Sequence, residues 1–127
     1  FNEIVRAGVK RIALSHPEGS REGRDRLIPF SQQICSQYGT KMYIEDDPLI
    51  TDLFPYSMNL GKYNIIYYKF ESDIQEYLTL KQKKRELVLS GRYSGEPRAE
   101  IVRRFGKLLS YSDEAIETLI SSNNEKE

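Results

Sequence analysis

Cysteine and histidine are nearly absent from this chain of 127 residues, which contains one of each. The single cysteine, Cys35, excludes an intramolecular disulfide and favours a reducing, cytoplasmic compartment. It lies among apolar positions of a predicted helix, so we expect a buried thiol. Because a structural zinc site needs about four Cys or His ligands, the sequence predicts no metal site. It indicates no particular cofactor.

Long apolar runs and a net charge are also missing. No apolar stretch approaches the roughly 20 residues that a membrane-spanning helix needs, so we expect no membrane partner. The formal net charge is +0 at pH 7. Lys and Arg nevertheless outnumber the acids over residues 81–107, whereas the acids outnumber them over 41–76. This uneven distribution is compatible with a small anionic ligand without requiring one.

Hydrophobic periodicity predicts a single α/β domain over residues 1–120 with a small sheet. Short segments rich in β-forming residues predict three strands, at 10–15, 41–45 and 62–70. An amphipathic helix is expected from near Arg26 to a stop at Gly39, so the domain begins with a β-α-β unit. In that unit the first two strands lie side by side and parallel, with a right-handed crossover.

The second half of the chain is expected to be helical. Three amphipathic segments predict helices that begin near Ser72, Glu96 and Ser112. Ser72 and Gln75 have the spacing of a capping box. A further short helix is expected from Asp47-Pro48 to Phe54, where Pro55 ends it. Two segments are expected to be irregular: a loop at 20–25 and a frayed polar tail at 121–127.

The only histidine, His16, follows the first predicted strand in the segment from Ser15 to Ser20. Ligands of open α/β sheets bind outside the carboxyl ends of the strands, so Ser15 and Ser20 are candidate ligand-binding residues. Asp46 and Asp47 end the second strand, and parallel strands would bring them to His16. The pattern favours a binding site or a general base, His16, oriented by either aspartate. A solvated loop with capping residues is the alternative.

A second candidate site, residues 90–98, precedes a predicted helix. Glycines and hydroxyl side chains accompany Arg92 and Arg98 there. The N–H groups of a helix N-terminus and two guanidinium groups suit an anion, so Arg92 and Arg98 are candidate anion-binding residues. No Gly-Lys-Ser/Thr closes the segment, which therefore is not a Walker A loop. An ordinary helix–helix connection is the alternative.

Residues 98–120 resemble the rhythm of a helix-turn-helix motif. The positive charge lies on the first of the two helices, as Arg103, Arg104 and Lys107. The second helix, which would enter the groove of DNA, carries three acids and no base, and phosphates would repel it. Nucleic-acid or protein binding through the basic helix is therefore an alternative that the sequence disfavours.

The third predicted strand carries Tyr63, Tyr67 and Tyr68, which offer apolar area. A three-stranded sheet also leaves open edges, so we expect a homodimer formed through this region.

The segment Phe105-Gly106-Lys107-Leu108-Leu109-Ser110-Tyr111-Ser112 resembles a motif of an uncharacterised archaeal protein family, Gly-x-Leu-Leu-Gly-Tyr-Pro. Ser110 stands where the family has glycine and Ser112 where it has proline, and no cysteine follows. The resemblance covers fewer than ten residues. It implies a cytoplasmic archaeal protein of unassigned activity.

These patterns favour a small-molecule or anion-binding module, regulatory or otherwise, that uses the loops at the carboxyl ends of the strands. An enzyme with His16 as acid or base is the second hypothesis. Binding of nucleic acid or protein through the basic helices is the third.

Overall fold

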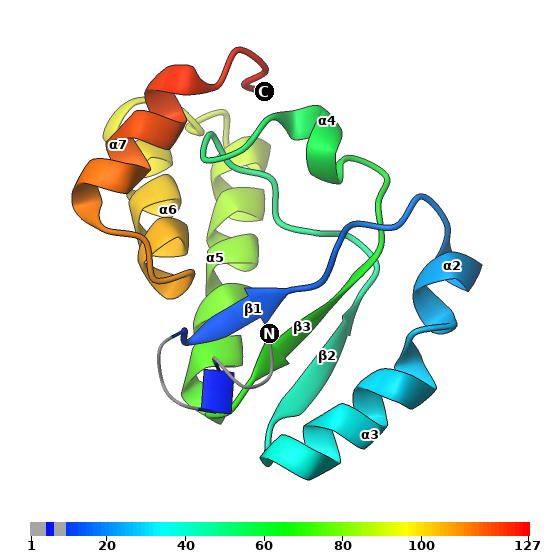
Figure 1. The fold of residues 1–127 in the computed structure, drawn as a ribbon. Coiled ribbons are helices and arrows are strands. Elements are labelled where there is room, and N and C mark those ends of the chain that lie inside the picture. Colours follow the sequence, from blue (N-terminus) through cyan, green and yellow to red (C-terminus); the bar gives the residue numbers. More distant parts are fainter. Residues whose placement is uncertain (1–4, 7–9) are drawn as a thin grey trace.

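A three-stranded sheet lies at the centre of the molecule (Figure 1). The computed structural model describes residues 5–6 and 10–127. The strands lie in the order β1-β3-β2, and their bounds are Ile12–Leu14 for β1, Lys41–Glu45 for β2 and Asn64–Tyr68 for β3. β3 is antiparallel to both neighbours. β1 and β2 therefore run in the same direction, with β3 between them.

This topology confirms the three strands and the three C-terminal helices, but the expected pairing of the first two strands is wrong. Tyr68 of β3 pairs with Ile12 on one side and with Lys41 on the other. The β-α-β unit is thus split by an inserted central strand. The physical reason is burial, because all five residues of β3 are buried, whereas an edge position would expose this most apolar strand.

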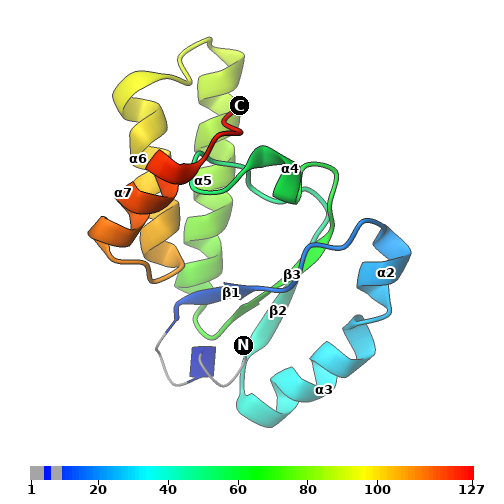
Figure 2. The ribbon, with the colours of Figure 1, turned by 45° about the horizontal axis from the view of Figure 1, so that its top comes forward.

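Helices cover both faces of the sheet, as Figure 2 shows from a second side. The short helix α2 (Arg21–Asp25) and α3 (Ile28–Tyr38) lie on one face. The opposite face carries α5 (Glu71–Leu89), α6 (Gly95–Leu108) and α7 (Asp113–Ser122). A single turn, α4 (Tyr56–Asn59), lies near the end of the sheet at which β1 and β2 finish. No helix of the described ranges is long and apolar enough to cross a membrane.

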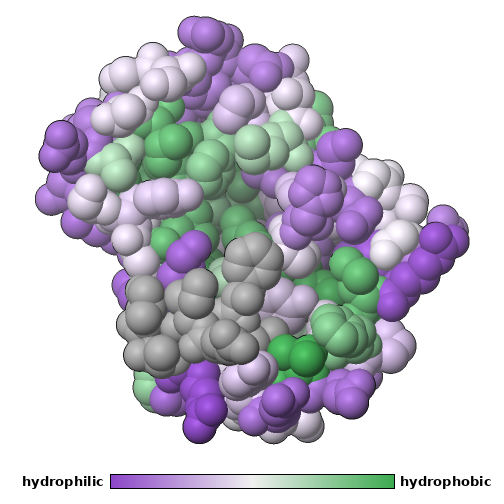
Figure 3. Space-filling view, in the orientation of Figure 1, coloured by the Kyte–Doolittle hydropathy of each residue, from purple (hydrophilic) through white to green (hydrophobic). Residues whose placement is uncertain are grey.

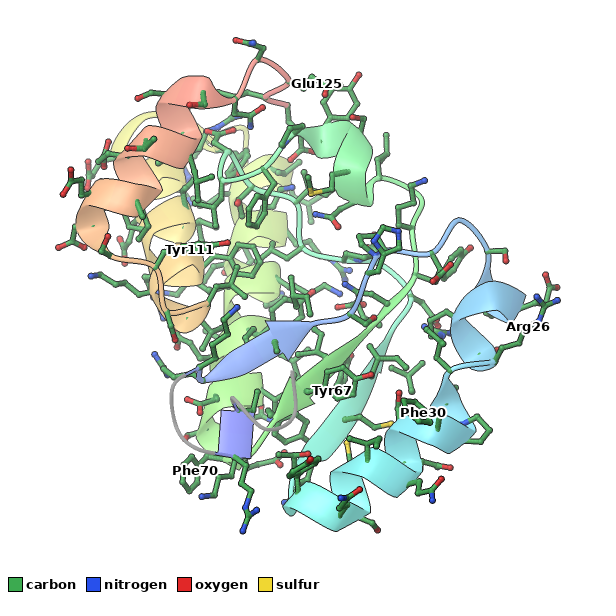
Figure 4. All side chains as sticks on the ribbon, in the orientation of Figure 1. Arg26, Phe30, Tyr67, Phe70, Tyr111 and Glu125 are labelled. Atoms are coloured by element: carbon green, nitrogen blue, oxygen red, sulfur yellow. The ribbon has the colours of Figure 1, made fainter. Side chains whose placement is uncertain are left out.

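The alternation of β3 divides the hydrophobic core in two. Ile66 and Tyr68 belong to the larger part, between the sheet and α5–α6, and Ile65 and Tyr67 to the smaller part, beside α3. Cys35 is buried in the smaller part, as its place on an apolar helix face predicts. Tyr67 lies between the sheet and α3 (Figure 4), where its hydroxyl is 2.8 Å from Ser31 Oγ.

Several helix boundaries agree with the sequence and others do not. Gly39 ends α3 with φ 66°, and Ser112 caps α7 by accepting a hydrogen bond from Ala115 N, both as expected. The predicted loop at 20–25 is instead α2, because the Ser20 hydroxyl accepts a hydrogen bond from Gly23 N. α5 begins at Glu71, so Ser72 is inside the helix and does not form the expected capping box.

The short helix predicted between Asp47-Pro48 and Phe54 does not form, and α4 begins only after Pro55. Side-chain oxygens accept hydrogen bonds from two backbone N–H groups of this segment. Leu49 N donates to the Tyr77 hydroxyl at 3.0 Å, and Leu53 N donates to Thr51 Oγ1 at 3.1 Å. Leu49 and Leu53 are buried, so the irregular segment is anchored in the core.

The last residues of the chain are docked on the domain rather than frayed. The side-chain amide of Asn123 donates to the carbonyl oxygens of Asp52 and Phe54, each at 3.0 Å. Glu125, which lies beside α4 in Figure 4, accepts a hydrogen bond from Tyr56 N through its carbonyl oxygen. Residues 123–125 therefore satisfy backbone groups of the irregular segment and hold it in place.

Candidate functional site

A cavity of about 320 Å³ lies at the carboxyl end of β1, on the face of the sheet that packs against α5 and α6. We call it the His16 cavity. Its lining residues come from four parts of the chain: Lys10, Ala13, Leu14, Ser15, His16 and Pro17 from β1 and its flanking segments, Phe54, Met58 and Asn59 from the α4 region, Asn64 from the start of β3, and Leu109 and Tyr111 from the α6–α7 turn. Figure 3 shows hydrophobic surface gathered between α7, α4 and β1.

An irregular pairing of the chain after β1 places His16 in this cavity. Ser15 continues the ladder with Ile65, since their backbone N–H and carbonyl oxygen bond at 2.9 Å and Ile65 N donates to Ser15 Oγ at 2.8 Å. Glu18 then pairs with Tyr63. Residues 16 and 17, which follow β1, thus lie opposite the single residue 64 of β3, and this is the pattern of a β-bulge. Bulges redirect side chains, and here the bulge brings His16 over the start of β3.

Asn64 is the polar residue most deeply buried in the lining. It is the first residue of β3, its exposed fraction is 1%, and its side-chain oxygen Oδ1 has no hydrogen-bond partner among the described residues. A buried acceptor without a donor destabilises a protein by about 1–3 kcal/mol. Such groups are rare in folded proteins.

The walls of the His16 cavity are mainly apolar. Leu14, Phe54 and Leu109 pack against the larger core from which the cavity opens. The Tyr111 ring contacts the Phe54 ring edge-on, with centroids 6.3 Å apart and planes at 66°. Tyr111 is placed by the preceding Ser110, whose φ of 70° is the only positive φ of a non-glycine residue in the described part of the chain.

The charges that line the cavity are of one sign. Lys10 and His16 are the titratable bases of the lining, and no Asp or Glu belongs to it. Within residues 5–6 and 10–127, no carboxylate forms an ion pair with Lys10. The lining therefore combines the lysine Lys10, the imidazole of His16, the buried Asn64 and apolar walls.

Asp46 and Asp47, predicted to orient His16, lie outside this lining because β3 separates the ends of β1 and β2. Asp46 Oδ1 accepts a hydrogen bond from Arg24 Nη2 at 2.7 Å. That hydrogen bond, together with the nearby positive charges, lowers the pKa of Asp46. Asp47 borders a separate hollow beside α5. Among the other predicted residues at this end, Ser20 serves as the cap of α2.

Arg24 joins Asp46 to the end of β2. Its exposed fraction is 2%, and its Nη1 donates to the carbonyl oxygen of Glu45 at 2.8 Å. Burial works against its charge, but the hydrogen bonds to Asp46 and Asp25 outweigh it, so the pKa of Arg24 is raised.

The Glu45 carboxylate is buried beside Arg24 and is fully partnered. The Tyr77 hydroxyl donates to it at 2.7 Å, and Lys81 Nζ lies 2.9 Å from Oε2 and 3.0 Å from Oε1. Burial and the adjacent Glu45 charge raise the pKa of Tyr77 well above its usual value. Because each of these groups has its partner, the cluster stabilises the fold and leaves no group for a ligand.

Arg92 and Arg98, predicted to bind an anion together, have separate surroundings. Arg98 donates two hydrogen bonds to the Asp52 carboxylate, at 2.8 and 2.6 Å, and its guanidinium lies 4.6 Å from the centre of the Tyr93 ring. The hydrogen bonds to Asp52 raise the pKa of Arg98 despite partial burial. Arg92 is exposed and donates to Ser90 Oγ at 3.2 Å. Arg98 is therefore committed to a structural ion pair.

The basic residues of α6 are ion-paired as well. Arg103 pairs with Glu96, Arg104 Nη2 lies 2.7 Å from Glu76 Oε1, and Lys107 Nζ lies 2.6 Å from Asp113 Oδ1. These acids neutralise the face that would have to meet phosphates. Two of the three tyrosines on which the predicted homodimer depended, Tyr67 and Tyr68, are buried on the central strand.

Sequence reasoning missed Lys10, Asn59, Asn64 and Tyr111 as members of the site. One signal was present: Asn64 opens a strand of otherwise apolar residues, and asparagine is depleted in strands. The other members come together only through the tertiary fold. No family model, no curated protein and no solved structure matches this chain.

Proposed function

We propose that the protein binds a small organic molecule in the His16 cavity. The observation that carries this proposal is a hollow of about 320 Å³ with mainly apolar walls, whose lining includes His16, Lys10 and Asn64, a buried residue with an unpartnered side-chain oxygen. That volume falls within the roughly 300–1,000 Å³ of small-molecule sites. A ligand that supplies an N–H or O–H to Asn64 would remove the cost of the unpaired acceptor, so the group contributes to affinity.

The surroundings of His16 favour binding over acid–base catalysis. A catalytic histidine is oriented by a hydrogen bond to a second group, often a carboxylate. The lining of the His16 cavity holds no carboxylate, and Asp46 is bound to Arg24. His16 is therefore assigned a role in contacting a ligand.

A thermal-shift screen of the whole chain tests this proposal, with a library of small organic acids, bases and neutral compounds. A ligand present at 100 times its Kd stabilises the folded state by about 2.7 kcal/mol, which is a readily measured shift of Tm. We expect hits whose NMR chemical-shift changes lie on residues of the His16 cavity.

Asn64→Leu provides the specific test, and Asn124→Leu, an exposed position outside the cavity, is its matched control. The hits should bind Asn64→Leu at least about fivefold more weakly, since one hydrogen bond contributes about 1 kcal/mol. They should bind Asn124→Leu as they bind the original chain. A screen without hits, or hits indifferent to Asn64→Leu, would refute the proposal.

A further inference from the structure

The outer edge of β2 has no partner in the described part of the chain. β2 pairs with β3 alone, on the side of the sheet away from β1 (Figure 1). Within residues 5–6 and 10–127, no group outside the sheet forms a hydrogen bond with the backbone of Met42 or Ile44. Burial agrees with this edge position, because Met42 and Tyr43 are partly exposed and Ile44 is 36% exposed, whereas all of β3 is buried.

The hydrogen bonds of β3 show which backbone groups of β2 point outward. In a central antiparallel strand, successive residues direct their N–H and carbonyl groups alternately to the two neighbouring strands. The Ile65 carbonyl oxygen accepts a hydrogen bond from Ser15 N, so residue 65 faces β1 and Ile66 faces β2. Tyr43 is the partner of Ile66 and therefore directs its backbone groups to β3. The residues on either side of Tyr43 consequently direct theirs to the open edge.

These outward groups are complementary to those of a second copy of the chain. When two β2 strands lie antiparallel about a two-fold axis at Tyr43, Met42 of each copy is opposite Ile44 of the other. Both are outward-facing residues, so they form two pairs that each exchange two backbone hydrogen bonds. A shift by one residue would place an outward-facing residue opposite an inward-facing one, and a shift by two would leave a single such pair within the strands. The backbone therefore selects one register.

The side chains are compatible with the same register. Successive side chains of a strand point to opposite faces of the sheet. Tyr43 packs against the larger core and Met42 against the smaller one, so Met42 and Ile44 share the face that α3 covers. Pairing about Tyr43 thus places Met42 beside Ile44, and at each end of the contact it places Lys41 opposite Glu45. Apolar side chains meet apolar ones, and no like charges are opposed.

β2 also lacks the features with which proteins commonly block an open edge. Those features include prolines, bulges and charged side chains in the middle of the strand. The three middle residues, Met42, Tyr43 and Ile44, are neither charged nor proline, and the pairing with β3 continues without a bulge from residue 41 to residue 45. The edge is therefore free to pair.

We propose that the protein forms a two-fold dimer through the outer edge of β2, which joins the two sheets into one continuous sheet. The partner is a second copy because the outward groups and the end charges of β2 are complementary to themselves. β2 has five residues, fewer than the roughly 20–30 that each side of a stable interface contributes, so the dimer dissociates on dilution. This proposal is independent of the ligand-binding function.

Sedimentation velocity of the whole chain at about 1 to 500 µM tests the dimer. We expect the sedimentation coefficient to rise with concentration from that of a monomer to that of a dimer, and no further, because a two-fold contact is closed. A monomer at every concentration, or growth into larger assemblies, overturns the proposal.

Ile44→Lys tests whether the edge of β2 is the surface that pairs. A charge in the middle of the edge opposes strand pairing, so the Kd of the dimer should rise at least about tenfold. Leu89→Lys is the matched control, because it makes the same kind of change at an 81% exposed position, the last residue of α5. Circular dichroism verifies that both variants are folded. A dimer Kd that Ile44→Lys does not change overturns the proposal.

Disulfide cross-linking tests the register, in a Cys35→Ala chain so that each introduced cysteine is the only one. Tyr43→Cys meets its own copy at the axis, where Cα atoms about 4.5 Å apart are within the range that a disulfide bridges. Lys41→Cys lies roughly 13 Å from its copy and should not link. Air oxidation with a copper catalyst should therefore produce a covalent dimer of the first variant only, on a non-reducing gel.

Equal linkage of the two cysteine variants, or preferential linkage of Lys41→Cys, overturns the assigned register. Both variants are checked by circular dichroism before oxidation. Should Tyr43→Cys fail to fold, the comparison of Ile44→Lys with Leu89→Lys still decides whether β2 forms the contact.

Discussion

Buried polar groups occur at two places on the same end of the sheet, and only one of them is satisfied. At the end of β2, Glu45 is bound by Tyr77 and Lys81, and Arg24 is bound by Asp46 and the Glu45 carbonyl oxygen. At the end of β1, the Asn64 side chain keeps an acceptor without a donor. The first arrangement is complete within the protein, whereas the second leaves a buried oxygen without a partner.

Asn64 itself belongs to both places, which makes the contrast clear. Its backbone carbonyl oxygen accepts a hydrogen bond from Arg24 Nη1 at 3.4 Å, on the side of β2. Asn64 is also one of the residues that line the His16 cavity, and its buried side-chain oxygen has no hydrogen-bond partner among the described residues. Burial alone therefore does not identify a functional residue.

The largest effect is expected from breaking the satisfied cluster. Lys81→Met leaves the Glu45 carboxylate buried without its cation, and we expect the free energy of unfolding to fall by about 3–5 kcal/mol. Urea denaturation followed by circular dichroism measures this change. Lys83→Met, on the exposed side of the same helix, should change stability by less than about 0.5 kcal/mol. Similar values for the two variants would contradict a structural role for the Glu45 cluster.

The next effect has the opposite sign, because it removes the unsatisfied acceptor. Asn64→Leu keeps the size of the side chain and deletes the orphan oxygen, so we expect the free energy of unfolding to rise by about 1–3 kcal/mol. The same variant loses ligand affinity, as set out above. A clear loss of stability would instead show that the Asn64 amide holds the fold together.

A smaller effect concerns the pH dependence of the β2 end. The folded-state pKa of Asp46 is lowered, chiefly by the hydrogen bond from Arg24, so its stabilisation is present above the unfolded pKa, about 3.9, and is lost as pH falls through the folded pKa. Asp46→Asn should therefore make the free energy of unfolding fall less steeply at low pH. The difference should be at most about 1 kcal/mol, because the Asp46 side chain is half exposed and its ion pair is screened by solvent. Denaturation curves at pH 2 to 6 (about the range in which carboxylates titrate) measure the slope, and an unchanged slope would contradict the role of Asp46.

The smallest effect is expected at the turn that places Tyr111 in the cavity. Ser110→Gly relieves the positive φ of 70° but gives the unfolded chain more freedom, so the two contributions largely cancel. We expect a rise of about 0.5 kcal/mol in the free energy of unfolding, measured by thermal denaturation. Ser110→Ala keeps the strained conformation and should show no such rise. Equal stability of Ser110→Gly and Ser110→Ala would show that loss of the hydroxyl, and not relief of the positive φ, causes the change.

Local signals in the sequence predicted elements well where nearby residues control the backbone. Gly39 ends α3 because glycine adopts the left-handed conformation without steric cost, and Ser112 caps α7 through its own hydroxyl. The segment around Ile65 and Ile66 formed a strand, as β-branched residues favour. His16 follows the first strand, as the sequence predicted, and it belongs to the lining of a cavity.

The predictions that disagree with the structure concern residues whose hydrogen-bond partners are distant in the sequence. The segment 47–54 is irregular rather than helical, and the N–H of Leu49 within it is bound by the distant Tyr77 hydroxyl. The polar tail is docked because Asn123 satisfies the carbonyl oxygens of residues 52 and 54. Arg98, predicted to bind an anion, is instead ion-paired with Asp52. Each of these partners is more than 25 residues away along the chain, beyond the reach of local patterns.

The amino-acid sequence by itself determined the kinds of element and their order, since strand and helix periodicity are properties of neighbouring residues. Only the tertiary structure decided that β3 would lie between β1 and β2, because burial of an apolar strand on both edges is a property of the whole sheet. That choice separated His16 from Asp46 and placed Asn64 beside it. The chemistry of the proposed site was therefore decided by strand order.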